Sequence, residues 1–378
     1  MNRRIAWAEA NMPVIGEVAH RFAGERPFEG TTIGMSLHLE PKTAVLVRTL
    51  VAGGARVVAT GNLGTTQDDV VAALRTDGVE TFGSRSDSPE DHARNLAAIL
   101  DAGPDLLLDN GADLAAGAVD LPVRGGTEET TSGALRLRGE LSGRVGFPVI
   151  VINDSPLKAI VENEHAVGQS IVESFQRITN LMLQGRRFVV VGYGWCGRGI
   201  ARYARALGAL VTVVEPDEIK ALEAAMEGLR VAPIDVAVVD ADVVITATGA
   251  EGVVSADHAE TMSEGAILAN AGHFDREIDV EAIRERSVDA VPAGDALVRY
   301  TMPSGRRVVV VAEGRMMNLA GPGPKGNSIE SMDLGFTLQA LSLERIATAP
   351  DTLVAGPQPV PDDIDRHAAA AMVRSIMR

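Results

Sequence analysis

The sequence predicts an α/β fold made of two doubly wound domains, in which helices cover both faces of parallel sheets. Short runs of β-branched and aliphatic residues recur along the chain and alternate with longer segments whose apolar residues have helical spacing. Each parallel strand needs a crossover to return to the same edge of the sheet, so this alternation indicates parallel sheets. A chain of 378 residues is long enough for two or three such domains.

Residues 1–157 contain the elements of one sheet. After a helical segment at 6–22, we expect helices at 41–53, 65–76 and 88–102 and strands at 31–37, 55–60, 80–83, 105–108 and 147–152. Such sheets bind ligands at the carboxyl ends of their strands. The first candidates for chemistry are therefore the polar residues at those ends: His38, Asn62, Asp109 and Asn153.

The segment from Gly185 to Glu215 carries the strongest motif of the chain. A strand at 187–191 is followed by glycines at G-x-G-x-x-G spacing, an amphipathic helix and a second strand that ends in Glu215. The first glycine permits the tight turn, the second lets the backbone approach a pyrophosphate, and the third lets the helix pack on the strand. Because all parts fall in order, we predict a Rossmann-type dinucleotide-binding domain rather than a glycine-rich turn with a chance acid.

Glu215 also indicates which dinucleotide binds. A carboxylate at this place accepts a hydrogen bond from the ribose 2′-hydroxyl, and no arginine directly follows it to neutralise a 2′-phosphate. We therefore expect NAD rather than NADP.

The rest of the chain continues the alternation. We expect helices at 159–183, 217–227, 328–348 and 362–377 and strands at 242–246, 266–270 and 307–312. The stretch GPGPKGNS at 321–328 superficially suggests a phosphate-binding P-loop, but the required order of glycine, lysine and hydroxyl residue is absent. A hinge is the better interpretation.

Composition excludes several classes of function. The net charge of -16 argues against nucleic-acid and anionic-membrane partners, and no apolar run reaches the ~18 residues that a membrane helix needs. Cys196 is the only cysteine, so one chain can form no disulfide and no cysteine-built metal site. Without a signal-peptide core at the start, we expect a cytoplasmic protein that binds no metal.

Several short runs together resemble the S-adenosylhomocysteine hydrolase family over nearly the whole chain. These runs are SLH around His38 with TAVLVRTL after it, GNLGTTQD, LLLDNGADL, EETTSG, INDSPLK, GYGWCGRG, AAMEG, NAGHFDREID and VVVAEGRMMNL. The resemblance implies a substrate-binding domain at 1–157, an NAD-binding domain at 158–320, and a hinge with C-terminal helices at 321–378 that pack back on the first domain. It also implies a homo-oligomer, either a dimer or a tetramer.

The resemblance further implies a redox-neutral reaction on a nucleoside. The 3′-hydroxyl is oxidised with tightly bound NAD, the C4′ hydrogen becomes acidic, a base removes it, and the 5′ substituent leaves. In the hydrolase, water then adds and C3′ is reduced again. Such a path needs a base at the 3′-hydroxyl, an acid/base at C4′–C5′ and a dry site.

Individual roles carry over from the matching motifs. Lys158 corresponds to the family's lysine at the 3′-hydroxyl, and Glu162 stands where the family has an aspartate. His38 corresponds to the histidine near C4′–C5′, His273 to the one near the nicotinamide, and Glu129 to the ribose-contacting glutamate. The implied NAD contacts are Thr130, Thr131, Ser132, Asn163, Gly192, Gly194, Trp195, Cys196, Gly197, Arg198, Gly199, Glu215, Thr248, Ala271, Gly272 and Asn318, with Lys220 in the place of an asparagine.

The chain also departs from the family pattern on the substrate side. Asn110, after Asp109 in the same run, replaces the aspartate next to the acid/base histidine and cannot take up a proton. Glu40 and Lys42 stand where the family reads the adenine edge. A histidine expected just past the hinge is missing from the altered segment 321–331, and the chain ends at Arg378 without the family's C-terminal tail.

These departures indicate a changed substrate. Our leading hypothesis is a nucleoside lyase or dehydratase that releases a 5′ group, with Asp109 and Glu40 on the substrate. A genuine S-adenosylhomocysteine hydrolase and a non-catalytic NAD-binding regulatory protein are the alternatives. A plain dehydrogenase fits less well, because it would have to release its reduced cofactor.

Overall fold

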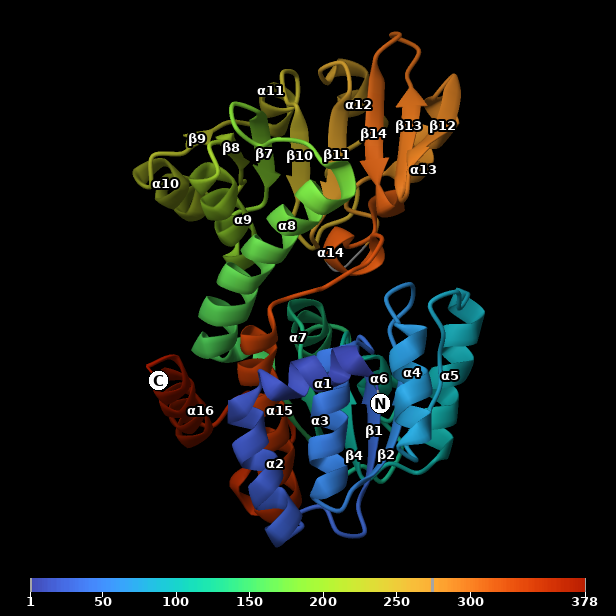
Figure 1. Cartoon of the computed structure of the whole chain (residues 1–378), viewed down its shortest axis with the longest axis vertical. Coiled ribbons are helices and arrows are strands. Elements are labelled where there is room, and N and C mark those ends of the chain that lie inside the picture. The colour runs from blue at the N-terminus through green and yellow to red at the C-terminus, as the bar shows by residue number, and fades with distance from the viewer. Residues whose placement is uncertain (1, 273–274, 378) are drawn as a thin grey trace. The chain divides into compact units, whose positions relative to one another are not determined.

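The computed structural model describes residues 2–272 and 275–377 and divides into two compact units. Unit 1 comprises Met1–Ala159 and Ile329–Arg378, and unit 2 comprises Ile160–Ser328. Each unit has its own mainly parallel sheet and its own helices (Figure 1). The predicted α/β class is confirmed.

The sheet of unit 1 is entirely parallel. Its order is β15-β6-β5-β4-β1-β2-β3, so the order of strands along the chain reverses between β1 and β4. A polar group that follows either strand therefore lies at the switch point, where doubly wound sheets bind their ligands. The strands are β1 (Thr32–Ser36), β2 (Arg56–Thr60), β3 (Glu80–Thr81), β4 (Leu106–Asp109), β5 (Gly125–Glu128), β6 (Pro148–Val151) and β15 (Gly356–Pro359).

Two strands of this sheet were not predicted. β5 has the sequence GGTE and β15 has GPQP, so neither shows the apolar run that marks a buried strand. β15 pairs only with β6 at the edge of the sheet, where proline is tolerated because one side of the strand needs no donor.

The helices of unit 1 differ from expectation at the N-terminus and in α6 and α7, which were not predicted. The helical segment expected at 6–22 is two helices, because Pro13 has no N–H to continue the first one. The Asp333 carboxylate accepts hydrogen bonds from the N–H groups of Val14 (2.9 Å) and Ile15 (2.7 Å), which caps the second helix. The helices are α1 (Arg3–Ala10), α2 (Pro13–Glu25), α3 (Pro41–Ala52), α4 (Asp68–Thr76), α5 (Pro89–Asp101), α6 (Asp113–Gly117), α7 (Thr131–Arg138), α15 (Ile329–Thr348) and α16 (Asp362–Ile376).

Unit 2 has the Rossmann strand order. Six parallel strands run β9-β8-β7-β10-β11-β14, so the switch point lies between β7 and β10. An antiparallel hairpin, β12–β13, extends the sheet beyond β14 and was not predicted, because its outer strand is largely exposed and contains Pro292. The strands are β7 (Arg187–Val191), β8 (Leu210–Val214), β9 (Arg230–Val231), β10 (Val243–Thr246), β11 (Ala266–Asn270), β12 (Asp289–Gly294), β13 (Leu297–Thr301) and β14 (Arg307–Val311).

The long helix expected at 159–183 begins as a π-helix over Lys158–Ala166 and continues as α8 (Val167–Thr179). π-Helical turns are rare and often occur at functional sites.

In the described part of the chain, no helix is long and apolar enough to cross a membrane. The other helices of unit 2 are α9 (Trp195–Ala206), α10 (Glu218–Met226), α11 (Ile234–Ala237), α12 (Ala256–Thr261), α13 (Val280–Arg286) and α14 (Met317–Ala320).

Candidate functional site

The carboxyl edge of the unit 1 sheet carries two buried ion pairs. Lys158 Nζ lies 3.1 Å from Glu129 Oε1, and both side chains are more than 90% buried. Glu129 directly follows β5, and Lys158 follows the 3-10 turn after β6. A buried charge is tolerated only when it is paired. The pair therefore places an ammonium and a carboxylate at the end of two neighbouring strands.

The second ion pair joins Glu40 and Lys42, two of the residues that depart from the family pattern. Lys42 Nζ lies 3.0 Å from Glu40 Oε2 at the start of α3, and both side chains are buried. Burial raises the pKa of Glu40, Lys42 lowers it, and the negative charge of Glu129 raises it further. Unit 1 therefore holds two buried ion pairs whose carboxylates, Glu40 and Glu129, repel each other.

A chain of hydrogen bonds connects the loops after β1, β2 and β4. His38 Nδ1 lies 2.7 Å from Thr65 Oγ1, and the Thr65 hydroxyl lies 3.1 Å from the carbonyl of Asn62. Asn62 Nδ2 donates to Asn110 Oδ1 at 2.8 Å. The sequence analysis selected His38, Asn62 and Asn110 but not Thr65, which lies where a helix was expected. α4 begins only at Asp68, because the hydroxyls of Thr65 and Thr66 bond to Asn62 instead.

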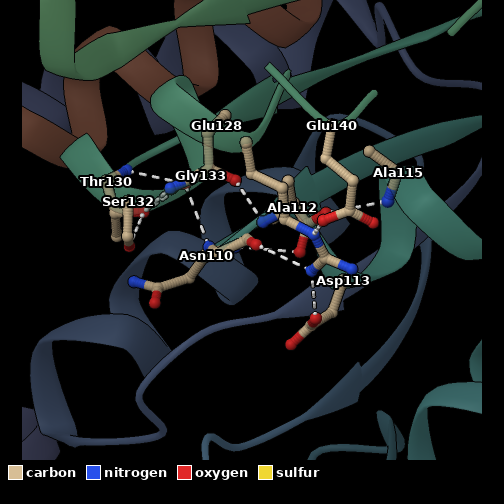
Figure 2. Close-up of polar contacts among 12 residues, drawn as sticks. Asn110, Ala112, Asp113, Ala115, Glu128, Thr130, Ser132, Gly133 and Glu140 are labelled. Atoms are coloured by element: carbon tan, nitrogen blue, oxygen red, sulfur yellow. Dashed lines mark hydrogen bonds and ion pairs between the residues drawn. The ribbon is translucent and has the colours of Figure 1, made fainter. Parts of the chain in front are cut away.

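Two further buried carboxyl groups lie behind these loops. Asp109 accepts from the N–H groups of Asn110 (2.9 Å) and Ala115 (2.8 Å), so its oxygens bind its own loop. Glu128, which the sequence analysis missed, accepts four hydrogen bonds from the loops around Ala112 and Thr130 (Figure 2). Burial raises the pKa of both groups, and the charge of Asp109 raises that of Glu128 further. The four donors around Glu128 fit its charged form.

The hydroxyl residues after β5 are held at the start of α7. Thr130 caps this helix, since its Oγ1 accepts from the Gly133 N–H at 2.9 Å, and it lies 3.0 Å from Ser132 Oγ. Thr131 is more exposed, and its hydroxyl donates to Asn153 Oδ1 at 3.0 Å.

In unit 2 the glycine loop fits a pyrophosphate. Gly192 has φ +97°, and a Cβ on Gly197 would lie 1.9 Å from the Gly192 carbonyl oxygen, so neither position accepts a side chain. A Cβ on Gly194 would meet nothing within 4 Å, which leaves open space above the turn. The N-cap residue of α9 is Gly194, which has no side chain to bind the first N–H groups of the helix. An anion could bind there, because the first N–H groups of a helix lack intrahelical partners.

Glu215 lies beside this loop at the end of β8. Its carboxylate accepts from the N–H groups of Tyr193 (2.6 Å) and Asp217 (3.0 Å), which holds it next to the glycine turn. A carboxylate keeps further lone pairs after two such bonds, so Glu215 can still accept from ribose hydroxyls. The residues present therefore fit an NAD adenosine ribose and pyrophosphate.

Comparison with known proteins shows what the chain is related to. Residues 163–323 match the family model of the S-adenosyl-L-homocysteine hydrolase NAD-binding domain, and residues 2–121 match that of S-adenosyl-L-homocysteine hydrolase. The S-inosyl-L-homocysteine hydrolase of Methanopyrus kandleri is 47% identical over 98% of this chain and 89% of its own length. The adenosylhomocysteinase of Archaeoglobus fulgidus is 43% identical over 99% of this chain and 94% of its own length. The chain belongs to the S-adenosyl-L-homocysteine hydrolase family.

Membership confirms the resemblance and the cofactor. NAD is the cofactor of this chain, as the glycine loop and Glu215 indicated. The S-inosyl-L-homocysteine hydrolase of Methanothermobacter thermautotrophicus is 42% identical over 97% of this chain and 89% of its own length, so curated relatives include hydrolases of two different nucleosyl compounds. The reaction class shared by these relatives is hydrolysis.

Several predicted NAD contacts lie in the glycine loop or near it. Arg198 packs its guanidinium 4.9 Å from the Trp195 ring and binds Glu223 of α10 at 2.6 Å, so its charge is already paired. Gly199 lies against the backbone of Glu164, where a Cβ would be 1.8 Å from the carbonyl oxygen. Cys196 is half-buried in the first turn of α9, and Lys220 is half-exposed in α10.

The remaining predicted contacts follow β10, β11 and β14. Glu277 Oε2 accepts from the N–H and the hydroxyl of Thr248, both at 2.8 Å, and a Cβ on Gly272 would collide with the Glu277 carboxylate. Ala271 is buried directly after β11, and Asn318 donates to Ser170 Oγ at 2.9 Å. Glu277 was missed, because a glutamate in a loop gives no sequence signal.

Three predicted site residues need separate mention. Glu162 and Asn163 lie in the π-helical segment, where Glu162 is buried. His273 lies outside the described residues. Among the described residues no group of three or more histidine, cysteine or acidic side chains could hold a metal ion. The individual roles of all these residues stay predictions.

Proposed function

We propose that the chain eliminates the 5′ substituent of a purine nucleoside through transient oxidation of the 3′-hydroxyl. The observation that carries this proposal is the buried pair of Lys158 and Glu129 at the carboxyl edge of unit 1. A lysine and a carboxylate 3.1 Å apart can hold a vicinal diol, and the lysine in its neutral amine form can take up the proton that leaves the hydroxyl. When bound, NAD supplies the oxidation of this hydroxyl and the later reduction of the ketone.

The other residues of the edge have roles at C4′, C5′ and the base. Removal of the C4′ proton forms the C4′–C5′ double bond as the bond from C5′ to its substituent breaks. His38, whose ring is held by Thr65, takes up the C4′ proton and passes it to the leaving group. Glu162, four residues after Lys158 in the chain, supports that lysine. Thr130, Thr131 and Ser132 orient the nicotinamide side from the start of α7.

The charged pair of Glu40 and Lys42 suits the Watson–Crick edge of a purine. A lysine only donates and a carboxylate only accepts, and both adenine and hypoxanthine offer one donor next to one acceptor there. The relatives named for S-inosyl- and S-adenosyl-L-homocysteine both fit this pattern. We propose a purine nucleoside as the substrate class.

Two outcomes follow elimination. If water does not add back, the enzyme is a lyase or dehydratase that releases a 4′,5′-unsaturated nucleoside. Asn110 favours this outcome, because its amide binds Asn62 and cannot activate water as a carboxylate would. If water adds back, the enzyme hydrolyses an S-nucleosyl-L-homocysteine, which the names of the relatives favour.

The test uses the purified protein with its bound cofactor. S-adenosyl-L-homocysteine, S-inosyl-L-homocysteine and free purine nucleosides are added in turn, while absorbance near 340 nm, thiol release and product masses are recorded. We expect reduced cofactor with a purine nucleoside and a product lighter by the mass of HX, where X is the 5′ group. Prompt thiol release with a fully hydrated nucleoside product would establish the hydrolase instead. No absorbance change with any nucleoside would favour a non-catalytic NAD-binding protein.

The assembly and the organisation of the chain belong to the same proposal. We expect a cytoplasmic homodimer or homotetramer, a substrate-binding domain at 1–157, an NAD-binding domain at 158–320 and a hinge at 321–326. Light scattering after size exclusion measures the mass of the assembly directly, and a monomer would contradict the first of these expectations.

A further inference from the structure

The side chain of Glu128 lies between two loops that carry predicted site residues. It is the last residue of β5 and is fully buried. Its Oε1 accepts from the N–H of Gly111 (3.0 Å) and from the N–H (2.7 Å) and hydroxyl (2.6 Å) of Thr130, and its Oε2 accepts from the N–H of Ala112 (2.9 Å). One carboxylate therefore ties the loop after β4 to the loop after β5 (Figure 2).

The loop after β4 has a backbone conformation that needs this support. Ala112 has φ +60° and ψ +31°, a left-handed conformation that is unfavourable for a residue with a Cβ. Gly111 before it also has positive φ, at +101°. Successive residues in such conformations turn their N–H groups toward one anion, and here both groups point at Glu128. Strained residues of this kind persist only where their surroundings fix them.

The loop held in this way carries Asn110. The Asn110 side chain accepts from Asn62, whose carbonyl contacts the Thr65 hydroxyl next to His38. On its other side Glu128 is followed directly by Glu129, the partner of Lys158. Close packing also fixes Glu128 itself, since a Cβ on Gly133 would lie 2.2 Å from its carboxyl carbon.

We propose that Glu128 is a positioning residue that sets the 5′-side groups, Asn110 and His38, relative to the 3′-side groups, Glu129 and Lys158. The proposal rests on the proposed function, in which the two sets act on adjacent carbons of one sugar. Glu128 touches neither substrate nor cofactor in this role; it acts through the two loops.

The substitution Glu128→Gln separates this role from general support of the fold. A carboxamide has one acceptor oxygen, which can keep the three donors at Oε1, but its NH2 then faces the N–H of Ala112. Ala112 therefore loses its acceptor and the loop with Asn110 can shift, whereas the bonds to Gly111 and Thr130 remain and Glu129 stays in place. We therefore expect the release of the 5′ group to slow by about 10²-fold, whereas 3′-oxidation slows less than about fivefold.

Both steps are measured in a single turnover of the protein with bound NAD. Absorbance near 340 nm reports 3′-oxidation, and quenched samples report release of the 5′ group. The matched control is Glu80→Gln, the same chemical change at an exposed glutamate that pairs with Arg56; it should leave both rates unchanged. Equal loss in both steps, or no loss in either, would overturn the proposal.

A second measurement decides the question if the variant does not fold. In the wild-type protein, hydrogen exchange of a peptide covering residues 110–113 should be slow, because Glu128 binds two of its N–H groups. Fast exchange there would overturn the proposal. A wild-type protein that never reduces its cofactor with any nucleoside would instead refute the proposed function, whatever the exchange rates.

Discussion

In unit 1 the loops at the carboxyl edge of the sheet carry buried ion pairs, whereas in unit 2 the corresponding loops carry glycines and the start of a helix whose N-cap residue is Gly194. Both sheets have the same doubly wound order with a switch point. The common architecture therefore does not decide what each edge does. Paired charges suit a polyhydroxylated ligand whose protons must move, and exposed backbone N–H groups suit a phosphate that is only held.

The two edges nevertheless share one structural feature, a buried glutamate whose carboxylate holds a loop. Glu128 in unit 1 and Glu277 in unit 2 are both fully buried. Glu128 accepts two hydrogen bonds from the loop after the neighbouring strand β4 and two from Thr130, and Glu277 accepts three from the loop after β10. Both need a glycine beside the carboxylate, Gly133 and Gly272 respectively. A buried carboxylate thus fixes irregular backbone that the sheet alone cannot hold. The predictions below test how far the two edges differ in function.

The largest expected effect is that of Lys158→Ala. Removing the lysine leaves no amine to take the 3′-hydroxyl proton, so we expect 3′-oxidation to fall by about 10³-fold or more. The NAD content, measured by chromatography after denaturation, should stay at the wild-type level, because the glycine loop of unit 2 is untouched. A variant that still reduces its cofactor at the wild-type rate would show that Lys158 has another role.

The reciprocal change in unit 2 is Gly194→Ala. A Cβ at this position meets no protein atom within 4 Å, so the stability of the protein without cofactor should not change. The methyl group would occupy the space that the pyrophosphate needs, and we expect NAD affinity to fall by about 10- to 100-fold in calorimetric titration. Unchanged affinity would mean that the phosphates do not approach this turn.

The double substitution Glu40→Gln with Lys42→Met tests the base-reading pair. Both charges disappear together, so no unpaired charge is left buried, and the protein should fold. We expect KM for the purine substrate to rise by about tenfold or more with little change in kcat and none in NAD affinity. The single variant Lys42→Met serves as the contrast, because an unpaired Glu40 should destabilise the fold by about 3 kcal/mol.

Glu277→Gln should have a smaller effect, confined to the cofactor. Glutamine has one side-chain acceptor oxygen instead of two, so the N–H groups of Thr248 and Gly249, which bind different oxygens of Glu277, cannot both keep their bonds. We expect NAD affinity to fall about tenfold. Glu251→Gln is the control, since Glu251 is exposed and pairs with Arg276 at 3.3 Å. If Glu277→Gln instead altered the KM of the nucleoside alone, the assignment of NAD binding to the unit 2 edge and nucleoside binding to the unit 1 edge would be wrong.

The smallest effect is expected away from both edges, at Asp333. Burial raises the pKa of Asp333 to about 6, although the N–H groups of Ile15 and Val14 oppose the shift. The folded pKa lies above the unfolded value of 3.8. The stabilising contribution of protonated Asp333 to the free energy of unfolding is therefore complete below pH 3.8 and is lost as the pH rises through 6. The stability of Asp333→Asn relative to wild type should therefore rise by roughly 2 kcal/mol between pH 4 and pH 7. Urea unfolding at both pH values measures this change, and turnover at pH 7 should stay the same.

The sequence predicted the parts of this protein that have strong local patterns. Apolar runs located β1, β4, β7 and β11, and glycine spacing located the dinucleotide turn. Polar residues at strand ends led to His38 and Asn62, and the family resemblance led to Asn110; the structure joins the three through hydrogen bonds that include Thr65. These patterns are local, so they can be read without knowing the fold.

The residues that sequence reasoning missed depend on contacts between distant segments. β5 and β15 gain their place by pairing with neighbours, although their own residues favour turns. Glu128, Thr65 and Glu277 are ordinary polar residues by type, and only their buried partners give them importance. Thr65 was assigned to a helix, because the competing bond of its hydroxyl to Asn62 has no sequence signature.

The chain enters unit 2 before unit 1 is complete. α15 and β15 reach unit 1 only from residue 329 onward, so a ribosome has made all of unit 2 before Asp333 can cap α2. During synthesis, unit 2 can therefore fold first. Until residues 329–378 are made, the β6 edge of unit 1 lacks β15, and the N–H groups of Val14 and Ile15 lack Asp333, so both remain exposed to water. Unit 1 contains the first residue of the chain, yet its sequence is completed after that of unit 2.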